Sequence, residues 1–357
     1  MLVLQDGRPC YEIEFTDGFS GLADVLSGLG FSKRRIAVIS DSLVAPLYLS
    51  ALTDTLKGLP CTLVSHVIPA GEEHKTLDTV RGIYRFLIGE HFDRHDLLLA
   101  LGGGVTGDIT GFAAATFLRG ISFVQIPTTL LAQCDSSIGG KTGVDFEGYK
   151  NMVGAFKNPR LVWMNLTTLK TLDDRQFLAG FAEVIKHGFI MDRAYFDWLL
   201  AHREQILKRD VGTLIEMIEK SCDIKRQVVE EDPKEQGLRA VLNFGHTIGH
   251  AIEKYSGFTL LHGECVSLGM RAAAAFSVHA GKLSGSEEEE LVSALTSFGL
   301  PVRFAHTDQD TDALLSLIRS DKKADGDQVK FVLLSGIGKA GFTHIPVEDL
   351  RVGVDAL

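Results

Sequence analysis

Three histidines stand close together in the segment NFGHTIGHAIEKYSGFTLLHGE, which runs from residue 243 to residue 264. His246 and His250 are four residues apart, so on a helix they share one face, and His262 follows after an intervening loop. A divalent metal site that does chemistry commonly takes three protein ligands and keeps one position open. Two histidines and one carboxylate would form such a site. The alternative is that these are ordinary helical histidines that bind no metal. The pattern is not HExxH, because Thr247 stands where that motif has its glutamate.

The carboxylate has to come from elsewhere in the chain. Glu183 lies in GFAEVIKHG, an otherwise apolar helical pattern, with Lys186 one turn further along the same face. A buried pair of opposite charges needs a compensating partner, and a metal ion supplies one. Glu183 is therefore the candidate carboxylate ligand.

A second kind of chemistry is indicated by LGGGVTGDITG (101–111), which runs from an apolar strand through glycines into a helix. Glycines let the backbone approach a ligand closely, and the free N–H groups of a helix N-terminus attract an anion. The alternative is a tight strand-to-helix turn that binds no ligand. The loops PAGEEHKT (69–76) and IPTTLLAQCDSSIGGKTG (126–143) follow other predicted strands, and Asp41 closes the first strand. Ligands of parallel sheets collect at the carboxyl ends of strands, so these loops together favour a nucleotide site, with Asp41 accepting from ribose hydroxyls.

The elements that must position these residues are of two kinds. Strand patterns at 35–40, 61–69, 96–104, 121–127 and 161–165 alternate with helix patterns such as 76–90 and 107–118. Continuous apolar strands that alternate with helices predict an α/β parallel sheet covered on both faces. Later patterns are almost all helical, at 174–191, 210–232, 247–255, 263–281 and 286–299, with one late strand pattern at 330–335. The change of pattern places the domain boundary at residue 170 and predicts the domains 1–170 and 171–357.

Composition narrows the class of protein. The chain has 357 residues, 45% of them hydrophobic and 23% charged, which is typical of a globular protein large enough for two domains. A net charge of −10 argues against non-specific nucleic-acid binding. The five cysteines are scattered, without a CxxC pair, and indicate free thiols in a reducing compartment. With no signal-peptide pattern and no long apolar run, we expect a cytoplasmic protein without a membrane partner.

Several sequence blocks resemble those of the 3-dehydroquinate synthase family and occur in the family's order. They are GGGVTGDITGFAAATFLRG, VQIPTTLLAQCDSSIGGKTG, KNMVGAFKNP, AGFAEVIKHG, GLRAVLNFGHTIGHAIE and LHGECV. The resemblance extends from about Tyr11 to the last predicted strand. It implies an α/β N-terminal Rossmann-like domain and an all-α C-terminal domain, with the site between them. It also implies NAD, one divalent metal ion (zinc or cobalt) and a homodimer.

The resemblance implies a specific reaction. The small-molecule substrate would be 3-deoxy-D-arabino-heptulosonate 7-phosphate, a phosphorylated sugar acid, which the family converts to 3-dehydroquinate and phosphate in the shikimate pathway. The chemistry comprises a transient oxidation by NAD, elimination of phosphate, reduction, ring opening and an intramolecular aldol closure. The metal lowers the pKa of the hydroxyl that is oxidised. The leaving phosphate can itself take the proton, so a dedicated protein base is not required.

The resemblance also assigns residues. It makes Glu183, His246 and His262 the metal ligands, so the pair His246 and His250 is not a pair of ligands, and His250 becomes a substrate contact. The positions that match NAD contacts are Asp41, Glu72, Lys75, Gly103, Gly104, Asp108, Thr128, Thr129, Lys150, Thr168, Leu172 and Gln176. The positions that match substrate contacts are Asp135, Lys141, Asn151, Lys186, Lys225, Glu235, Arg239, Asn243, His250 and one of Lys322 and Lys323. Arg119 matches an arginine that reaches into the partner subunit's site.

The basic residues among these positions suit a phosphate dianion and a carboxylate, because arginine offers a planar fork and lysine a point charge. One departure from the family pattern is Tyr149, which stands where the family often has glycine before Lys150 and Asn151. It bears on the shape of that loop.

Three other functions remain open from the sequence. A sibling sugar-phosphate cyclase, making an aminodehydroquinate, 2-deoxy-scyllo-inosose or a valiolone, would share the fold, NAD and the metal. A metal-dependent polyol dehydrogenase would release NADH, and the DSSIGGKTG block argues against it. A non-catalytic binding protein would have lost a metal ligand, whereas Glu183, His246 and His262 are all present.

Overall fold

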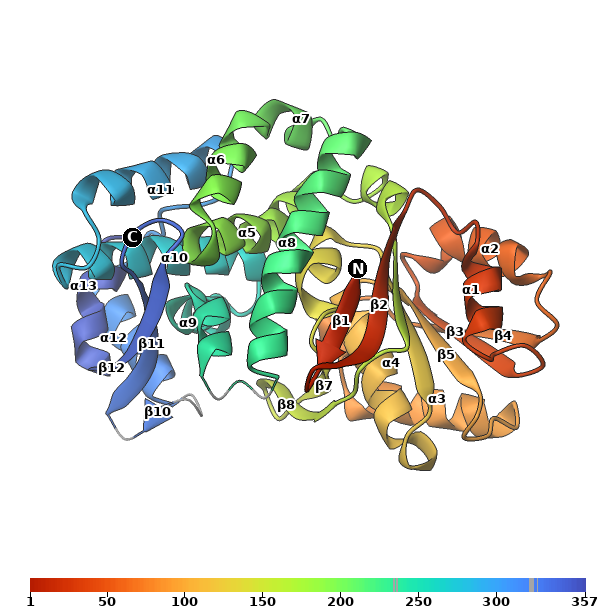
Figure 1. Ribbon diagram of the computed structural model, residues 1–357. Helices are drawn as coiled ribbons and strands as arrows, with labels where there is room; N and C mark the ends of the chain where they lie inside the picture. Colours follow the sequence, from red (N-terminus) through yellow and green to blue (C-terminus); the bar gives the residue numbers. More distant parts are fainter. Residues whose placement is uncertain (234, 236, 321–323, 326) are drawn as a thin grey trace. The chain divides into compact units, whose positions relative to one another are not determined.

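The computed structural model describes residues 1–233, 235, 237–320, 324–325 and 327–357 (Figure 1). The chain divides into two compact units, Met1–Leu172 and Asp173–Leu357. The sequence had placed this boundary at residue 170.

The first unit is built on a seven-stranded sheet with the order β1-β2-β9-β6-β5-β3-β4. All neighbouring pairs are parallel except β1 with β2. The expected parallel α/β architecture is confirmed, with one antiparallel strand added at its edge. The strands are β1 (Leu2–Gln5), β2 (Arg8–Thr16), β3 (Arg35–Asp41), β4 (Thr62–Ile68), β5 (Leu97–Gly102), β6 (Ser122–Pro127) and β9 (Leu161–Asn165).

Both faces of this sheet are covered by helices, which explains its continuous apolar strands. Successive side chains of a strand point to opposite faces, so Ile36 packs on one side and Ala37 on the other. The helices α1 (Leu22–Gly28) and α2 (Ala45–Leu56) supply core leucines on the first side. On the second side lie α3 (Leu77–Gly89) and α4 (Gly104–Thr116).

A separate antiparallel hairpin, β7 (Lys141–Phe146) with β8 (Tyr149–Phe156), belongs to the first unit and was not predicted. Its strands contain few continuous apolar runs, because much of β8 is exposed or half-buried. Short helical turns complete the unit: η1 (Glu72–His74), η2 (Phe117–Arg119), η3 (Ala132–Ser136) and η4 (Leu166–Lys170).

The second unit is mainly helical, as expected. Its helices are α5 (Asp174–Met191), α6 (Arg193–Ala201), α7 (Arg203–Leu207), α8 (Val211–Glu231), α9 (His246–Tyr255), α10 (His262–His279), α11 (Gly285–Ser297), α12 (Asp308–Arg319) and α13 (Arg351–Val354), with the short turns η5 (Leu238–Asn243) and η6 (Val347–Leu350) (Figure 1). The description as all-α needs one correction, because an antiparallel sheet with the order β10-β11-β12 is also present. Its strands are β10 (Ala324–Asp325), β11 (Gln328–Leu334) and β12 (Ala340–Pro346). The late strand pattern at 330–335 corresponds to β11.

Side-chain caps decide where the long helices of this unit begin. The Asp173 carboxylate accepts hydrogen bonds from the N–H groups of Arg175 and Gln176, at 2.9 and 3.3 Å, and so starts α5. Asp210 starts α8 in the same way by accepting from the N–H of Thr213 at 2.9 Å. Such caps satisfy backbone donors that lack a partner within the helix. They fix the register of the helices that carry the candidate site.

The five cysteines are free thiols, as expected from their spacing. Cys134, Cys222 and Cys265 are buried and act as small core residues, while Cys10 and Cys61 are half-buried. In the described part of the chain, no helix has both the length and the apolar character that a membrane crossing requires.

Candidate active site

In the first unit, candidate residues follow the carboxyl ends of several strands. Asp41 ends β3, and its carboxylate accepts from the N–H groups of Leu43 and Val44, each at 3.0 Å. It also accepts from the hydroxyl of Thr106 at 2.9 Å. A Cβ on Gly102 would lie 2.5 Å from the Thr106 hydroxyl oxygen, so glycine is required for this contact. Asp41 thus joins the end of β3 to the start of α4.

The glycine turn after β5 has the expected form. α4 begins at Gly104 with Gly103 as its N-cap, and no side chain of the described residues caps it. A Cβ on Gly103 would lie 3.1 Å from the Thr129 methyl group, and one on Gly104 would lie 3.0 Å from the Ser136 hydroxyl. The exposed N–H groups and the closely packed glycines leave the helix N-terminus ready for an anion. The N–H of Thr128, which follows β6, donates to the carbonyl of Gly102 at the end of β5, at 2.9 Å.

Thr128 also carries an unusual hydroxyl. Its side chain is 4% exposed, and the hydroxyl oxygen has no hydrogen-bond partner among the described residues. A buried polar group without a partner is unfavourable by about 1–3 kcal/mol. A polar ligand at this strand end would satisfy the hydroxyl, which fits the NAD position expected for Thr128.

Lys75 is the centre of a buried polar network. Its ammonium group lies 2.7 Å from Asp108 Oδ2, donates to Asn151 Oδ1 at 2.6 Å, and lies 3.9 Å from Glu72 Oε1. Burial alone would lower the pKa of Lys75, but the charges of Asp108 and Glu72 outweigh it and raise that pKa. Lys150 lies 3.5 Å from the same Glu72 oxygen. The network brings together four predicted NAD positions and Asn151, which was predicted to contact substrate.

The hairpin β7–β8 presents Asn151 in a special conformation. Asn151 has φ +50°, and its N–H donates to the Asp145 carboxylate at 2.8 Å. The N–H of Asp145 in turn donates to the carbonyl of Lys75 at 2.8 Å. Asp145 was not predicted as a site residue. No short-range sequence pattern singles it out, because its role depends on the pairing of the hairpin with Lys75.

The remaining predicted NAD positions are Thr129, Thr168, Leu172 and Gln176. The Thr129 hydroxyl accepts from the N–H of Ala132 at 3.2 Å, and the buried Thr168 hydroxyl donates to the carbonyl of Asn165 at 2.8 Å. Leu172 is the last residue of the unit. Gln176 lies in α5 and therefore belongs to the second unit.

Three predicted substrate or partner contacts also lie in the first unit. Asp135 is in η3, and Lys141 opens β7 after two glycines with positive φ. Arg119 is exposed and has φ +69°, between Leu118 at +51° and Gly120 at +120°. Positive φ is uncommon for residues other than glycine, so this turn is held in an unfavourable conformation.

In the second unit, Glu183, His246 and His262 come from three different helices and meet at one point. Glu183 Oε1 lies 3.6 Å from His246 Nε2 and 3.5 Å from His262 Nε2. Glu183 is completely buried in α5, while His246 opens α9 and His262 opens α10. Glu183 Oε1 has no hydrogen-bond partner among the described residues. An unsatisfied buried carboxylate oxygen beside two imidazole nitrogens is a donor set that fits a divalent cation.

His250 belongs to the same cluster. The side chains of His246, His250 and His262 each offer a ligand atom, and these atoms all lie within 4.8 Å of one another. The ring centroid of His250 lies 5.2 Å from that of His246 and 5.7 Å from that of His262. Spacing alone would have made His246 and His250 the ligand pair, whereas the fold also brings His262 and Glu183 to the same place.

Glu183 is held ionised by its neighbours. Its second oxygen, Oε2, accepts a hydrogen bond from the buried ammonium of Lys186. Burial alone would raise the pKa of Glu183, but the charges of Lys186 and His262 lower that pKa well below its usual range. Lys186 therefore engages one carboxylate oxygen, and the other oxygen faces the histidines.

Glycines allow the three helices to approach closely enough for this cluster. A Cβ on Gly263 would lie 1.8 Å from the carbonyl oxygen of Ala179 in α5. A Cβ on Gly269 would lie 1.8 Å from the carbonyl oxygen of Gly245, directly before α9. These helix crossings exclude any larger residue. They place His262 against Glu183 and against His246.

The remaining predicted substrate contacts of the second unit are buried or lie in the segment that leads into α9. Lys225 in α8 is 5% exposed, and Arg239 in η5 is 3% exposed. Arg239 Nη1 donates to the carbonyl of Pro233 at 2.8 Å. Asn243 Nδ2 donates to Glu235 Oε1 at 2.7 Å, which joins two of the predicted positions. Lys322 and Lys323 lie outside the described residues.

Two acidic residues near the histidine cluster were not predicted. Glu253 Oε2 lies 3.8 Å from His262 Nδ1, and Glu253 is 3% exposed. Glu264 accepts from the N–H of Leu261 at 2.8 Å and from Arg175, and so fixes the start of α10. A sequence signal for Glu253 existed, since it is three residues after His250 and shares its helix face.

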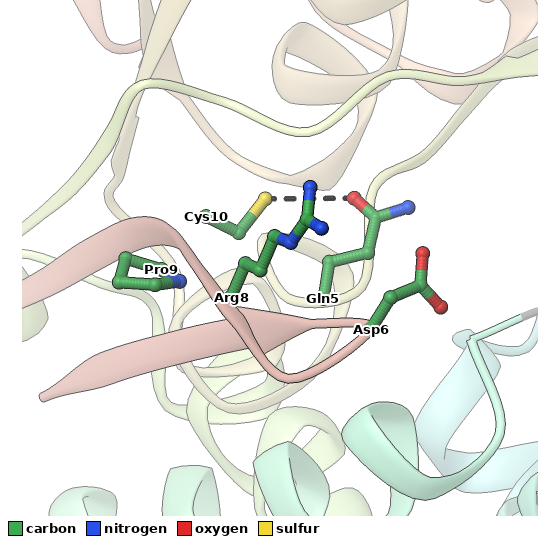
Figure 2. Close-up of a pocket in the computed structure, with 5 residues that line it drawn as sticks. All are labelled: Gln5, Asp6, Arg8, Pro9 and Cys10. Carbon is green, nitrogen blue, oxygen red and sulfur yellow. Dashed lines mark hydrogen bonds between the residues drawn. The ribbon is translucent and has the colours of Figure 1, made fainter.

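A surface hollow lies at the β1–β2 turn of the first unit. It is lined by Gln5, Asp6, Arg8, Pro9 and Cys10, and the Cys10 thiol lies 3.6 Å from Gln5 Oε1 (Figure 2). None of the predicted site residues lines it.

Comparison with known proteins places both units in one family. Residues 65–179 match the 3-dehydroquinate synthase N-terminal family, and residues 180–324 match the 3-dehydroquinate synthase C-terminal family. A 3-dehydroquinate synthase of Syntrophotalea carbinolica is 48% identical over 341 residues, which are 94% of this chain and 93% of the relative. One of Acetivibrio thermocellus is 54% identical over 285 residues, 80% of this chain and 79% of the relative.

Solved structures with the same fold include two sibling cyclases. A 2-epi-5-epi-valiolone synthase of Streptomyces hygroscopicus with NAD⁺ and Zn²⁺ bound has a TM-score of 0.87 and 27% identity, over 97% of this chain and 96% of its own. A 2-deoxy-scyllo-inosose synthase complexed with carbaglucose-6-phosphate, NAD⁺ and Co²⁺ has a TM-score of 0.86 and 25% identity, over 100% of this chain and 99% of its own. The identity is much higher to the dehydroquinate synthases, and the chain belongs to the 3-dehydroquinate synthase family.

Proposed function

We propose that this protein converts 3-deoxy-D-arabino-heptulosonate 7-phosphate to 3-dehydroquinate and phosphate. The observation that carries the proposal is the meeting of Glu183 Oε1 with His246 and His262 from three helices, at 3.6 and 3.5 Å. A family member that had lost catalysis would have no reason to keep an unsatisfied carboxylate oxygen buried among imidazoles.

Glu183, His246 and His262 would hold one divalent ion, zinc or cobalt. One carboxylate oxygen and two imidazole nitrogens are ligands that both ions accept, and three protein ligands leave room for substrate. When bound, the ion would supply a Lewis acid for a substrate hydroxyl, and NAD would supply a reversible hydride acceptor. Lys186 keeps Glu183 ionised and oriented, because it occupies the other carboxylate oxygen.

NAD would lie at the carboxyl ends of the strands of the first unit. The start of α4, which no side chain of the described residues caps, would receive its pyrophosphate, with Gly103 and Gly104 permitting close approach. NAD would offer a partner to the Thr128 hydroxyl, which has none among the described residues. The remaining cofactor contacts are those predicted from the sequence: Asp41, Glu72, Lys75, Asp108, Thr129, Lys150, Thr168, Leu172 and Gln176.

The expected substrate contacts are polar and basic residues, some in each unit. Lys141, Lys225 and Arg239 offer positive charge to the phosphate and carboxylate groups, because both are anions at neutral pH. Lys75 orients the Asn151 amide through the bond to its oxygen, which leaves the amide N–H₂ to donate to substrate. The other expected contacts are Asp135, Lys186, Glu235, Asn243, His250 and one of Lys322 and Lys323.

The active form is a homodimer of a cytoplasmic protein, with Arg119 reaching into the partner subunit's site. The three successive positive φ values at Leu118, Arg119 and Gly120 support a turn that is kept for the display of this side chain. Mixing an R119A variant with an H262A variant tests the idea. Each is inactive alone, but a mixed dimer contains one complete site and regains part of the activity. No recovery, in dimers shown by mass spectrometry to have exchanged subunits, would contradict it.

The test of the reaction measures phosphate and 3-dehydroquinate released from 3-deoxy-D-arabino-heptulosonate 7-phosphate in the presence of NAD and zinc or cobalt. We expect equal amounts of both products, no net NADH, and loss of turnover after chelation. Release of product from glucose 6-phosphate or from an amino analogue instead would assign the chain to a sibling cyclase. Accumulation of NADH with simple polyols would assign it to the dehydrogenases.

A further inference from the structure

We infer that Glu253 is a positioning residue, which holds the ring of His262 so that Nε2 is the nitrogen free to bind metal. The inference rests on the proposed function, because it assumes a metal ion at Glu183, His246 and His262. It adds a residue that the family resemblance did not assign.

The two sides of the His262 ring face different carboxylates. Nε2 lies 3.5 Å from Glu183 Oε1, and Nδ1 lies 3.8 Å from Glu253 Oε2. A neutral imidazole carries one proton, and the nitrogen that binds a metal must be the one without it. A carboxylate beside Nδ1 favours the form with the proton on Nδ1. The lone pair of Nε2 then points toward Glu183 and His246.

His246 has the same arrangement with a different acceptor. Its Nδ1 lies 3.2 Å from the backbone carbonyl of Phe244, and its Nε2 lies 3.6 Å from Glu183 Oε1. In both histidines, therefore, Nδ1 faces an oxygen and Nε2 faces the Glu183 oxygen that has no hydrogen-bond partner among the described residues. Metal-bound histidines generally donate their second N–H to a carboxylate, carbonyl or water in this way.

Burial makes the position of Glu253 significant. Glu253 is 3% exposed, and a carboxylate is rarely so buried without a charged or hydrogen-bonding partner. It lies near the end of α9, and His262 is the first residue of α10. Hydrogen bonds from Phe258 N and Ser256 Oγ go to the Glu253 carbonyl, so they stabilise the loop between the helices without using the carboxylate.

The experiment compares E253M, E253Q and wild type in the full-length protein. Methionine keeps the volume but removes the acceptor, whereas glutamine keeps one acceptor oxygen without the charge. The dissociation constant for Co²⁺ is measured by competition with a chelator, and the visible absorption of the cobalt protein reports the ligand set. The matched control is K254M, a change to the same residue at the neighbouring exposed position of α9.

We expect E253M to bind Co²⁺ about 10–100-fold more weakly, with an altered visible spectrum, and E253Q to fall between E253M and wild type. NAD affinity and the far-ultraviolet circular dichroism should match those of K254M. Should E253M not fold, E253Q alone decides. A Co²⁺ affinity of the folded Glu253 variants within about twofold of wild type would overturn the inference.

Wild type and H262A separate this inference from the function on which it rests. If H262A loses Co²⁺ but the Glu253 variants do not, the metal site stands and the role of Glu253 is refuted. If wild type and H262A bind Co²⁺ equally weakly, the proposed metal site itself is refuted, and the inference falls with it.

Discussion

Glu183 shows how one buried residue can serve two partners. Oε2 accepts from Lys186, and Oε1 faces His246 and His262. A lone buried carboxylate would be strongly unfavourable, and the ammonium group offsets that cost without occupying both oxygens. Lys186 is predicted to contact substrate, so the same residue would link the metal ligand to the sugar.

The choice between Glu183 and His250 as the third ligand can be tested directly. E183Q and H262A should weaken Zn²⁺ binding by more than about 100-fold, because each removes a ligand and not merely a supporting contact. H250A should retain Zn²⁺ and lose turnover. Metal content after dialysis against a weak chelator distinguishes them. Loss of zinc from H250A with retention by E183Q would instead support a site of three histidines.

Metal binding should release a proton at neutral pH. Burial opposes the charged form of His262, but Glu183 and Glu253 outweigh it and raise the pKa of His262 to about 9. His262 is thus protonated at pH 7 and must lose its proton to become a ligand, whereas the lowered pKa of Glu183 means that it has none to lose. Affinity for Zn²⁺ should therefore rise as the pH increases toward 9.

Calorimetry in buffers of different ionisation enthalpy measures this proton. We expect about one proton released for each Zn²⁺ bound at pH 7, falling toward zero above pH 9. In H262A the release should disappear. A binding enthalpy that does not depend on the buffer in wild type would contradict the protonated state of His262.

At the scale of elements, the helix crossings are as important as the ligands. G263A introduces a Cβ only 1.8 Å from the Ala179 carbonyl oxygen, so α10 must move away from α5 and carry His262 with it. We expect a loss of about 3 kcal/mol in the free energy of unfolding, and weaker Zn²⁺ binding. G285A is the matched control, since a Cβ there has no neighbour within 4 Å. It should change stability by less than about 1 kcal/mol. Equal effects of the two variants in chemical denaturation would refute the packing argument.

The hairpin β7–β8 allows a similar comparison of two lysines. K75M removes the buried donor to Asp108 and Asn151 and should destabilise the protein by about 3 kcal/mol. K150A breaks only the half-exposed pair with Glu72 and should change stability by less than about 1 kcal/mol. K150A should nevertheless weaken the binding of NAD more than the binding of substrate. Titration showing the opposite order would move Lys150 from the cofactor contacts to the substrate contacts.

At the scale of the whole molecule, each ligand should stabilise its own unit first. Zn²⁺ alone should slow hydrogen exchange in α5, α9 and α10, whereas NAD alone should slow it in α4 and at the ends of β3, β5 and β6. At a hundred times its dissociation constant, either ligand adds about 2.7 kcal/mol to the stability of the state that binds it. Protection of α4 by Zn²⁺ alone would show that the ion binds elsewhere.

Much of the fold could be predicted because it depends on local periodicity. The apolar strands 35–40, 121–127 and 161–165 became β3, β6 and β9, since a strand buried on both faces needs a continuous apolar run. The helices α5, α8, α9, α10 and α11 were predicted from the helical spacing of their apolar residues, whereas α6 and α7 were not. The hairpin β7–β8 was not predicted, and only β11 of the second unit's sheet was. Exposed and half-buried strands such as β8 and β12 lack continuous apolar runs.

The sequence by itself determined which groups are available: a carboxylate at Glu183, imidazoles at His246, His250 and His262, and glycines before α4. Only the tertiary structure decided which of them meet. Spacing along one helix pairs His246 with His250, but His262 and Glu183 reach the same point from other helices, through glycine crossings that no local pattern reveals. The contacts of Glu253 with His262 and of Asp145 with Asn151 were likewise visible only in the tertiary structure. Contacts between distant segments arise from packing in three dimensions, and packing depends on every element at once.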